Sequence, residues 1–555
     1  MKKIFYLASI ICLALSSTSC EDFLTVESPD ELTTDNYWRN EQDAQAGLAA
    51  AYSQLYHGDT YATSEVRWPT EEYRADIVNL GSDAGNYDQW VALYYFNYTN
   101  GNTQFSYYYQ DLYRGINFAN QVLANVPNIP NLDENKRNEL LNEAHFLRGY
   151  YHMMLLLNWE KIIIRNEYIK ESSQLNRPLS ERTACWDFIL EELENYAAQL
   201  PESRNENELG RATSGTAYAY IGFAYLTRAY EEPEKKSTYL DKALTALNNV
   251  KGYSLVSGEN LIGMFNGTNK NCSESIFEVQ YSKSEANGSV HYSYLNQWIG
   301  AKELNGYDEI LPSNMLMEEY MKEGKLNDGR YDERLYNTIY FQCDYFNDGT
   351  GRVMGKEYDE LFGGENKPVF RRFTSPTLEE MQEACAINIP LMRYVNVLLM
   401  KAEVLNEQNH PEQAIPIINE IRSVHGNMPP MEGTTQQEVR DQIEHERILE
   451  FPLESYRWYD LRRWGKTASA LQKAGRTGFD ESKLFYPIPK WEIDANPEVN
   501  SEIFRFGRCC SSEPFSLLLP TKKDYKKEYV YCYRINVRRY GNRFPAPSPK
   551  IFVDK

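Results

Sequence analysis

The 555-residue sequence lacks the motifs on which most secreted enzymes depend. It contains no HExxH zinc motif, no GxSxG nucleophile motif, no phosphate-binding loop and no dinucleotide fingerprint. Its 79 acidic residues offer many carboxylate pairs, as a glycosidase would need, but the surrounding sequence distinguishes none of them. The sequence therefore predicts no catalytic residues, and we expect that the protein is not an enzyme.

Cysteine and histidine are scarce, with nine and seven residues. Nine cysteines are too few for a disulfide scaffold in a chain of this size, and no CxxC pair has metal-ligand spacing. Two acidic turns, residues 327–332 and 344–351, offer the oxygen atoms that calcium prefers. Neither has the spacing of an EF-hand, and turn formation alone explains both. We expect no metal site and no cofactor, with structural calcium left open.

Basic residues are fewer than acidic ones, and long hydrophobic runs are scarce. The 58 Lys and Arg residues leave a net charge of -21, which argues against a nucleic-acid partner because phosphate binding needs a basic surface. The single long apolar run, residues 4–15, is shorter than the roughly 20 residues that span a bilayer. It follows Lys2 and Lys3 and precedes four small residues and Cys20, the order of a secretory signal peptide. We expect residues 1–19 to be removed.

The residues around Cys20 resemble a bacterial lipoprotein cleavage site. This resemblance predicts a lipid anchor on Cys20, where several acyl chains would make membrane attachment effectively permanent. The alternative is an ordinary signal peptide that is cut nearby, with Cys20 incidental.

Aromatic residues are abundant, with 43 Tyr, 9 Trp and 23 Phe. Rings with polar tips suit sugar recognition, because the apolar face of a pyranose stacks on a ring while its hydroxyls bond to nearby polar groups. The alternative is that the tyrosines pack helices and coat the surface.

Amphipathic periodicity predicts a mainly α protein. Small residues such as Gly222 and Ala243 recur where neighbouring helices would pack, which is typical of tetratricopeptide-like helix pairs, here at 214–250 and 393–424. Asp35 is a suitable N-cap for the first helix. The expected helices of the first half cover residues 37–56, 105–126, 134–159, 182–200, 214–230 and 235–250.

Two stretches, residues 59–103 and 252–373, are rich in Gly and Asn and show no sustained helical period. Short alternating segments such as SIFEVQYS and RLYNTIYFQ predict short strands there. Long irregular insertions on a rigid scaffold are where binding sites tend to lie. We divide the chain into a signal peptide (1–19), an N-terminal helical region (20–250), a C-terminal region (251–500) and an atypical basic tail (501–555).

The segment HERILEFPLESYRWYDLRRW, residues 445–464, combines many charges with a proline. We expect ion pairs between Glu446 and Arg447 and between Arg457 and Asp460, along a helix that Pro452 kinks or splits. This pattern predicts a structural role.

Five stretches, in this order along the chain, resemble SusD/RagB outer-membrane nutrient-binding lipoproteins: CEDFLTVESPDELTTDNYW, NEAHFLRGYYHMMLL, IPLMRYVNVLLMKAEVLNE, the segment from His445, and LFYPIPKWEIDANP. The resemblance implies a helical fold with four tetratricopeptide-like units on one side and a loop-rich ligand-binding part on the other. It implies a protein that is not an enzyme and that hands oligosaccharides, or in some branches peptides, to a SusC-like TonB-dependent transporter. The acidic pair after Cys20 resembles the signal that exports such lipoproteins to the outer face of the outer membrane.

The family binds its ligand with exposed aromatic residues whose positions vary, so context guides the choice here. Six aromatic residues lie in the irregular segments beside Asn or Gln, which bond sugar hydroxyls. They predict weak, releasable binding of micromolar to millimolar strength, at about 1 to 2 kcal/mol per ring. The alternative is that some belong to the core. The candidates are Trp90, Tyr94, Tyr95, Tyr292, Tyr294 and Trp298.

Three other interpretations stay open, namely a peptide-binding member of the family, a helical-repeat scaffold that binds only proteins, and an anchored hydrolase.

The tail after residue 500 departs from the family pattern, because residues 503–555 hold twelve Lys and Arg against four Asp and Glu. We assign it no function.

Overall fold

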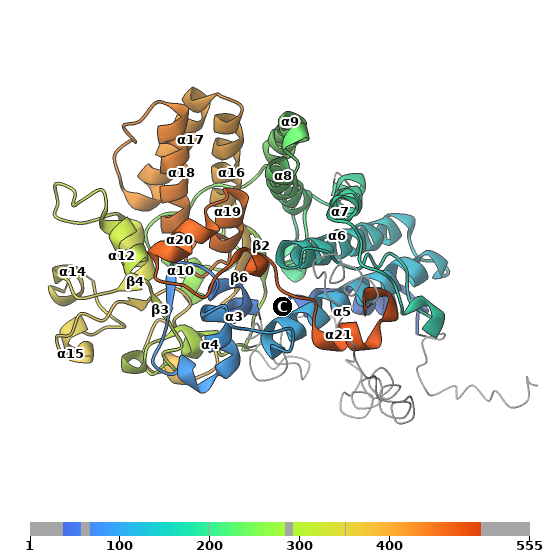
Figure 1. The fold of residues 1–555 in the computed structure, drawn as a ribbon, viewed down its shortest axis with the longest axis horizontal. Coiled ribbons are helices and arrows are strands. Elements are labelled where there is room, and N and C mark those ends of the chain that lie inside the picture. Colours follow the sequence, from blue (N-terminus) through green and yellow to red (C-terminus); the bar gives the residue numbers. More distant parts are fainter. Residues whose placement is uncertain (1–36, 57–66, 198, 284–291, 350, 501–555) are drawn as a thin grey trace, which may run out of the picture.

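A computed structural model describes residues 37–56, 67–197, 199–283, 292–349 and 351–500 of the chain. The predicted signal peptide, Cys20 and the basic tail lie outside these described residues. Two adjoining blocks of long helices run from the right of the molecule to its top, and a part built from loops, short helices and three pairs of short strands lies mainly on the left (Figure 1). The predicted mainly α fold is therefore confirmed. Within the described ranges, no helix has both the length and the apolar character that crossing a bilayer requires.

The first helical block follows the sequence prediction closely. Three of its helices begin after residues whose side chains accept hydrogen bonds from the first free backbone N–H groups, namely Asn102, Asp133 and Thr213. The block contains α2 (Glu41–Ser53), α5 (Thr103–Asn125), α6 (Glu134–Asn158), α7 (Arg182–Ala197), α8 (Ser214–Glu231) and α9 (Lys236–Asn248).

The start of α2 differs from the prediction. Asn40 is the N-cap, and its side chain accepts a hydrogen bond from the Asp43 backbone N at 3.0 Å. The helix therefore begins after the predicted cap Asp35, which lies outside the described residues.

The second block follows residue 393. Pro411 is the first residue of α17, where its missing N–H costs no helical hydrogen bond. The block contains α16 (Tyr394–Glu407), α17 (Pro411–Ile421), α18 (Gln436–Glu450), α19 (Arg457–Arg463) and α20 (Thr467–Lys473). The last described helix, α21 (Lys490–Ala495), lies beside α5 of the first block (Figure 1).

Consecutive long helices pack side by side in an arc. Helices α5 to α9 each contact the next, α9 contacts α16, and α16 to α18 continue the series (Figure 1). Small residues permit the close approach, as the sequence predicts, because a Cβ atom on Gly222 of α8 would lie 2.5 Å from Leu247 of α9. The remaining segments pack against this arc of helices.

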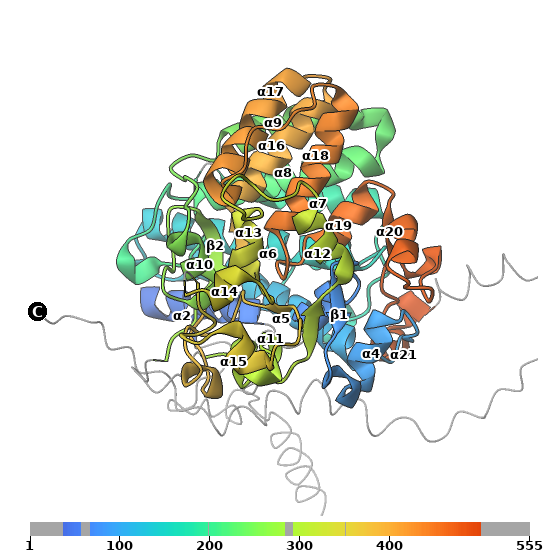
Figure 2. The same cartoon turned by 90° about the vertical axis from the view of Figure 1, so that its left-hand side faces the viewer.

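The loop-rich part contains three antiparallel pairs of strands, β2 with β6, β1 with β3 and β4 with β5. In Figure 2 the short helices α4, α11 and α15 lie at the bottom of the molecule, with α16 to α18 at the top. The strands are β1 (Val78–Leu80), β2 (Ser275–Val279), β3 (Ile310–Pro312), β4 (Ile339–Tyr340), β5 (Val369–Phe370) and β6 (Ile389–Arg393). The short helices are α3 (Arg67–Glu72), α4 (Asp88–Tyr94), α10 (Glu259–Asn266), α11 (Leu295–Ile299), α12 (Asn314–Met321), α13 (Glu333–Thr338), α14 (Asp344–Asn347) and α15 (Tyr358–Phe362).

Of the two predicted strands, the structure confirms one and contradicts the other. SIFEVQYS forms β2, as predicted. RLYNTIYFQ forms most of α13 before it reaches the two-residue strand β4, so its prediction as a strand is wrong. Asp332 explains the helix, because its side chain accepts a hydrogen bond from the Arg334 backbone N at 2.9 Å and thereby caps α13.

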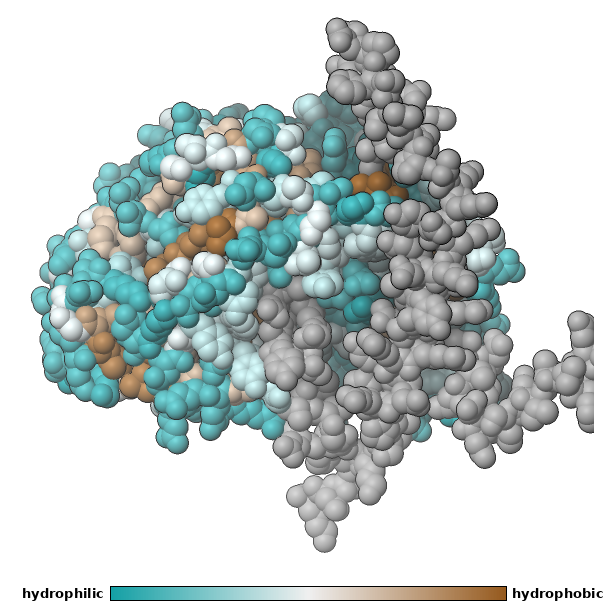
Figure 3. Space-filling view, turned by 60° about the horizontal axis from the view of Figure 1, so that its bottom comes forward, coloured by the Kyte–Doolittle hydropathy of each residue, from teal (hydrophilic) through white to brown (hydrophobic). Residues whose placement is uncertain are grey.

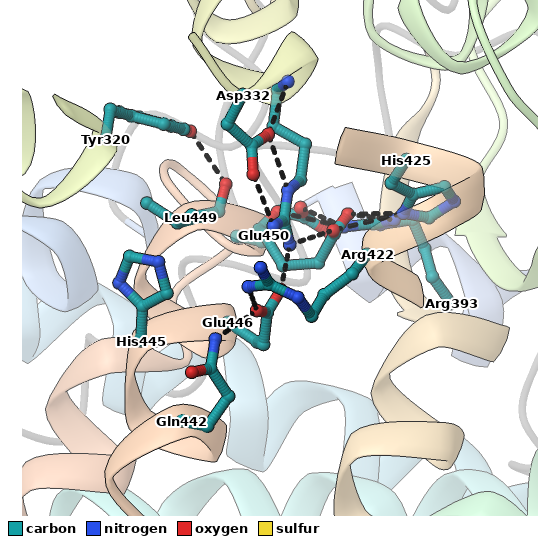
Figure 4. A network of polar contacts seen from close by, with 12 residues as sticks. Tyr320, Asp332, Arg393, Arg422, His425, Gln442, His445, Glu446, Leu449 and Glu450 are labelled. Carbon is teal, nitrogen blue, oxygen red and sulfur yellow. Dashed lines mark hydrogen bonds and ion pairs between the residues drawn. The ribbon is translucent and has the colours of Figure 1, made fainter. Parts of the chain in front are cut away.

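A buried ion-pair network joins the loop-rich part to the second helical block (Figure 4). Arg393, at the end of β6, pairs with Glu274 at 2.6 Å, with Glu454 at 2.7 Å and with Glu450 at 3.2 Å. The His425 ring lies between Glu274 and Glu450, with a nitrogen 3.0 Å from an oxygen of each. Because all of these side chains are almost fully buried, the network depends on mutual pairing instead of solvent.

The ion pairs of residues 445–464 differ from those predicted. Glu446 pairs with Arg334 at 2.6 Å and with Arg422 at 2.8 Å, while Arg447 pairs with Asp460 at 2.7 Å. Adjacent helical residues point in different directions, so Glu446 and Arg447 reach different partners. The predicted interruption at Pro452 is confirmed, since α18 ends at Glu450 and α19 begins only at Arg457.

Candidate functional site

Four of the six predicted site residues lie in a cluster of aromatic rings that the buried Tyr73 connects, since its ring centroid is 6.3 Å from that of Trp90 and 6.4 Å from that of Tyr94. The ring centroids of Trp90, on α4, and Trp298, on α11, are 5.2 Å apart. Tyr94 and Tyr95, at the end of α4, are 5.0 Å apart, and Tyr307 lies 5.2 Å from Trp298. We call this cluster the aromatic patch and define it as Tyr87, Trp90, Tyr94, Tyr95, Trp298 and Tyr307.

Most members of the aromatic patch present part of a ring to solvent. Tyr95 is 50% exposed and Tyr307 is 41% exposed, which are high values for large side chains. Tyr87, Tyr94 and Trp298 are half-buried. Several rings of the patch are therefore accessible to solvent, as stacking on a sugar requires.

Trp90 is the exception, and the structure corrects the prediction that its ring is open to a ligand. Its exposed fraction is 0%, and its ring stacks on Tyr87 at 4.2 Å and contacts Trp68 at 5.1 Å. The short helix α4 turns this side chain toward the core, where Tyr73 also meets it. Trp90 therefore supports the exposed rings from beneath.

Tyr292 and Tyr294 are half-buried and lie 5.6 Å from each other. Tyr294 precedes α11, and its backbone O accepts a hydrogen bond from Trp298 N at 3.1 Å. They remain predicted site residues.

Sequence reasoning missed Tyr87 and Tyr307. Tyr87 comes three residues before Trp90 in the same irregular segment, so the spacing of a helical turn was the available signal. Tyr307 follows a glycine in a loop and has no sequence signal. Its position depends on folding, since its backbone N donates to the Gln297 O at 2.7 Å and its hydroxyl to Gln297 Oε1 at 2.6 Å.

Backbone hydrogen bonds hold the two halves of the aromatic patch together. Gly81 N donates to Glu309 O at 2.7 Å, and Asp308 N donates to Gly300 O at 2.8 Å. Glycine is required at this join, because a Cβ atom on Gly81 would lie 1.8 Å from Asp308 O and one on Gly306 2.0 Å from Gly300 O. The segments that carry Tyr87, Trp298 and Tyr307 are therefore fixed relative to one another by the backbone.

The C-terminal part of the chain supports the other end of the patch. Arg476 is almost fully buried, with its guanidinium 3.4 Å from the centroid of the Tyr94 ring. It donates hydrogen bonds to Tyr94 O at 2.9 Å and to Tyr73 O. The backbone also comes close here, because a Cβ atom on Gly478 would lie 1.9 Å from Tyr95 O. Tyr94 and Tyr95 therefore rest on a packed base.

Two hollows elsewhere fit a sugar less well. A cavity of about 30 Å³ next to Trp68 and Glu72 has room for about one water molecule. An open groove of about 600 Å³ is lined by polar residues and a proline, and none of its lining residues is aromatic. Its lining residues are Glu139, Gln199, Pro201, Ser203, Arg204, Asn205 and Glu208.

On the face seen in Figure 3, the described surface shows no broad apolar area. The described surface there is largely hydrophilic, and its hydrophobic areas are small and separate. Isolated apolar areas of this kind are normal on a protein surface.

One group among the described residues has the spacing of a metal site. Ligand atoms of Glu323, His445 and Glu446 lie within 4.8 Å of one another. Arg422 already pairs with Glu323 at 2.6 Å and with Glu446 at 2.8 Å, and Arg334 pairs with Glu446. Because these cations occupy the carboxylates, we assign the group to the buried ion-pair network.

Two family models match the chain. The model described as "SusD family" matches residues 273–503, and the model described as "Starch-binding associating with outer membrane" matches residues 22–226. SusD-like protein P38 of Formosa agariphila is 24% identical over 545 residues, which cover 91% of this chain and all of that protein. The two models together account for most of the sequence.

Solved structures share the fold. A SusD superfamily protein of Bacteroides vulgatus matches with a TM-score of 0.72 and 23% identity, over 83% of this chain and 98% of that one. A laminarin-binding SusD-like protein matches with a TM-score of 0.66 and 22% identity, over 83% of this chain and 98% of that one. With the arc of helices, the loop-rich part and both sequence models in agreement, the chain belongs to the SusD/RagB family.

Proposed function

We propose that the protein binds nutrient oligosaccharides without altering them, and that the aromatic patch is the binding surface. The observation that carries this proposal is the set of exposed and half-buried rings on one fixed scaffold, with Tyr95 and Tyr307 as its most exposed members. The related proteins support it, since one solved structure is described as laminarin-binding and another, from Bacteroides thetaiotaomicron, as a surface glycan-binding protein.

The patch suits capture and release. Each stacked ring contributes about 1 to 2 kcal/mol, so three or four rings together correspond to micromolar or millimolar dissociation constants. The rings are preformed because backbone hydrogen bonds and Arg476 hold their segments, so binding loses little entropy in ordering them. A ligand held this way leaves fast enough to be passed on.

Single alanine substitutions at Trp298 and Tyr307 are expected to weaken oligosaccharide binding by about tenfold each, since each loses one stacking ring. The wild type is first tested on a panel of neutral, amino, uronate and sulfated oligosaccharides, with laminari-oligosaccharides among the neutral ones. Calorimetric titration then gives the dissociation constants.

The control variant is Tyr107→Ala, which removes an equally exposed tyrosine of α5 that lies outside the aromatic patch. Circular dichroism confirms folding. Equal affinity of all three variants and the wild type would remove the patch from the site. A wild type that binds peptides instead of sugars would favour the peptide-binding branch of the family.

We also propose that the protein is anchored in the outer membrane by acyl chains on Cys20, faces the cell exterior and delivers its ligand to a SusC-like TonB-dependent transporter. The sequence around Cys20 and the outer-membrane association in one family description support this location. Gentle detergent extraction of native outer membranes, followed by mass spectrometry, tests both parts. We expect an acylated N-terminus at Cys20 and a co-purified barrel protein, and recovery of an unacylated protein alone would contradict the proposal.

A further inference from the structure

Carboxylates gather beside the aromatic patch and outnumber the cations that pair with them. Lys302 pairs with Asp83 at 2.5 Å. Lys367 pairs with Glu303 at 2.8 Å and with Asp308 at 3.2 Å. Glu309 completes the group of four acids, but its pKa of about 8 keeps it mainly protonated at neutral pH, so three ionised acids face the two lysines. We call the four acids the acidic rim and define it as Asp83, Glu303, Asp308 and Glu309.

The acidic rim lies on the same two segments whose backbone hydrogen bonds hold the aromatic patch together. Asp308 and Glu309 directly follow Tyr307, and Asp83 comes four residues before Tyr87. The Ser82 backbone N donates to Asp308 Oδ2 at 3.1 Å, which fixes the two segments side by side. Asp308 and Glu309 are almost fully buried, whereas Asp83 and Glu303 are half-buried, so the latter two carry the negative charge that a sugar on Tyr307 would meet.

The pKa of Glu309 reflects its burial and the charges of the acidic rim around it. Its side chain is 2% exposed, and its Oε2 atom has no hydrogen-bond partner among the described residues. Burial first, and then the negative charges of Asp83 and Asp308, raise the pKa of this carboxyl to about 8, although Lys302 opposes the shift. Glu309 is therefore mainly uncharged at neutral pH, chiefly because it is buried, and the charges of Asp83 and Asp308 add to this preference.

The cations that the described part of the chain places at the patch do not reverse this balance. Arg476, beneath Tyr94, is almost fully buried, and backbone carbonyl groups occupy its guanidinium. The two lysines each already contact a carboxylate of the rim.

We propose that the acidic rim selects uncharged oligosaccharides for the aromatic patch and rejects those that carry carboxylate or sulfate groups. This inference rests on the proposed sugar binding at the patch and adds its charge selectivity. At the edge of the patch, screened repulsion between the rim and one ligand carboxylate corresponds to about a threefold to tenfold increase in the dissociation constant.

The test uses one ion pair whose two members carry opposite charges. Asp83→Asn and Lys302→Gln both break the same contact, but the first removes a negative charge and the second a positive one. The probes are laminari-oligosaccharides and the same oligosaccharides oxidised at C6 to glucuronates, titrated by calorimetry at low and at high salt.

We expect the ratio of the glucuronate to the neutral dissociation constant to fall about threefold in Asp83→Asn and to rise about threefold in Lys302→Gln. High salt should shrink both differences. The control Glu234→Gln, at an exposed position on the arc of helices, should leave the ratio at the wild-type value. If both ion-pair variants move the ratio in the same direction, the effect is structural and the inference is overturned.

Different results would contradict the charge selectivity and the sugar binding. Glucuronates that bind the wild type as tightly as neutral oligosaccharides would overturn the charge selectivity and leave sugar binding intact. A wild type that binds no member of the oligosaccharide panel would overturn the proposed function itself.

Discussion

Replacing Arg393 with methionine is expected to lower the free energy of unfolding by about 3 to 5 kcal/mol, because it leaves buried carboxylates without their cation. Arg393 is 1% exposed and contacts Glu274, Glu450 and Glu454. Methionine fills much of the volume of arginine, so the loss is chiefly electrostatic. Urea denaturation followed by circular dichroism measures the change.

The matched control is Arg352→Met, which removes an arginine that pairs with Glu357 at 3.1 Å on the surface. Exposed pairs contribute about 1 kcal/mol or less, so this variant should unfold nearly as the wild type does. If Arg393→Met is as stable as Arg352→Met, the network is not what joins the loop-rich part to the second helical block.

The stability of the protein is expected to fall by about 3 kcal/mol between pH 6.5 and pH 9 because of His425 alone. Burial alone would lower the pKa of this imidazole, but the charges of Glu450 and Glu274 outweigh burial and raise it to about 9. A raised pKa means that the folded state holds the proton more tightly than the unfolded state. The stabilisation is therefore complete below pH 6.5 and is lost as the pH rises through 9.

Urea midpoints of the wild type and of His425→Gln, measured from pH 6 to pH 10, isolate this contribution. Glu72 and Glu309, whose pKa values are both raised to about 8, titrate in both proteins and cancel in the difference. His152, with its pKa lowered to about 4, stays neutral throughout. The wild type should lose its advantage over the variant toward pH 9, and parallel pH profiles would show that His425 does not carry this proton.

The long helices could be predicted from the sequence, because their apolar period and their caps are local. Helices α6 and α8 begin where the pattern predicts, at Glu134 and Ser214. The partners of the buried charges could not be predicted in the same way. Arg393 and Glu274 are separated by 119 residues, and only the pairing of β2 with β6 brings them together.

In the candidate site, too, local features could be predicted from the sequence and long-range contacts could not. The sequence pointed to the two segments that carry Trp90 and Trp298, and the structure joins them. It could not tell which ring faces solvent, since the seven residues of α4 are too few to define an apolar face. Tyr307 was missed because its place depends on hydrogen bonds to Gln297, on another segment.

The most direct test of the account is a crystal structure of the protein with the neutral oligosaccharide that binds most tightly in the panel. We expect sugar rings stacked on Tyr95, Trp298 or Tyr307, with the glycosidic bonds intact. Density for the sugar in the polar groove beside Glu139 and Arg204, or cleavage of the oligosaccharide by the protein, would contradict the account.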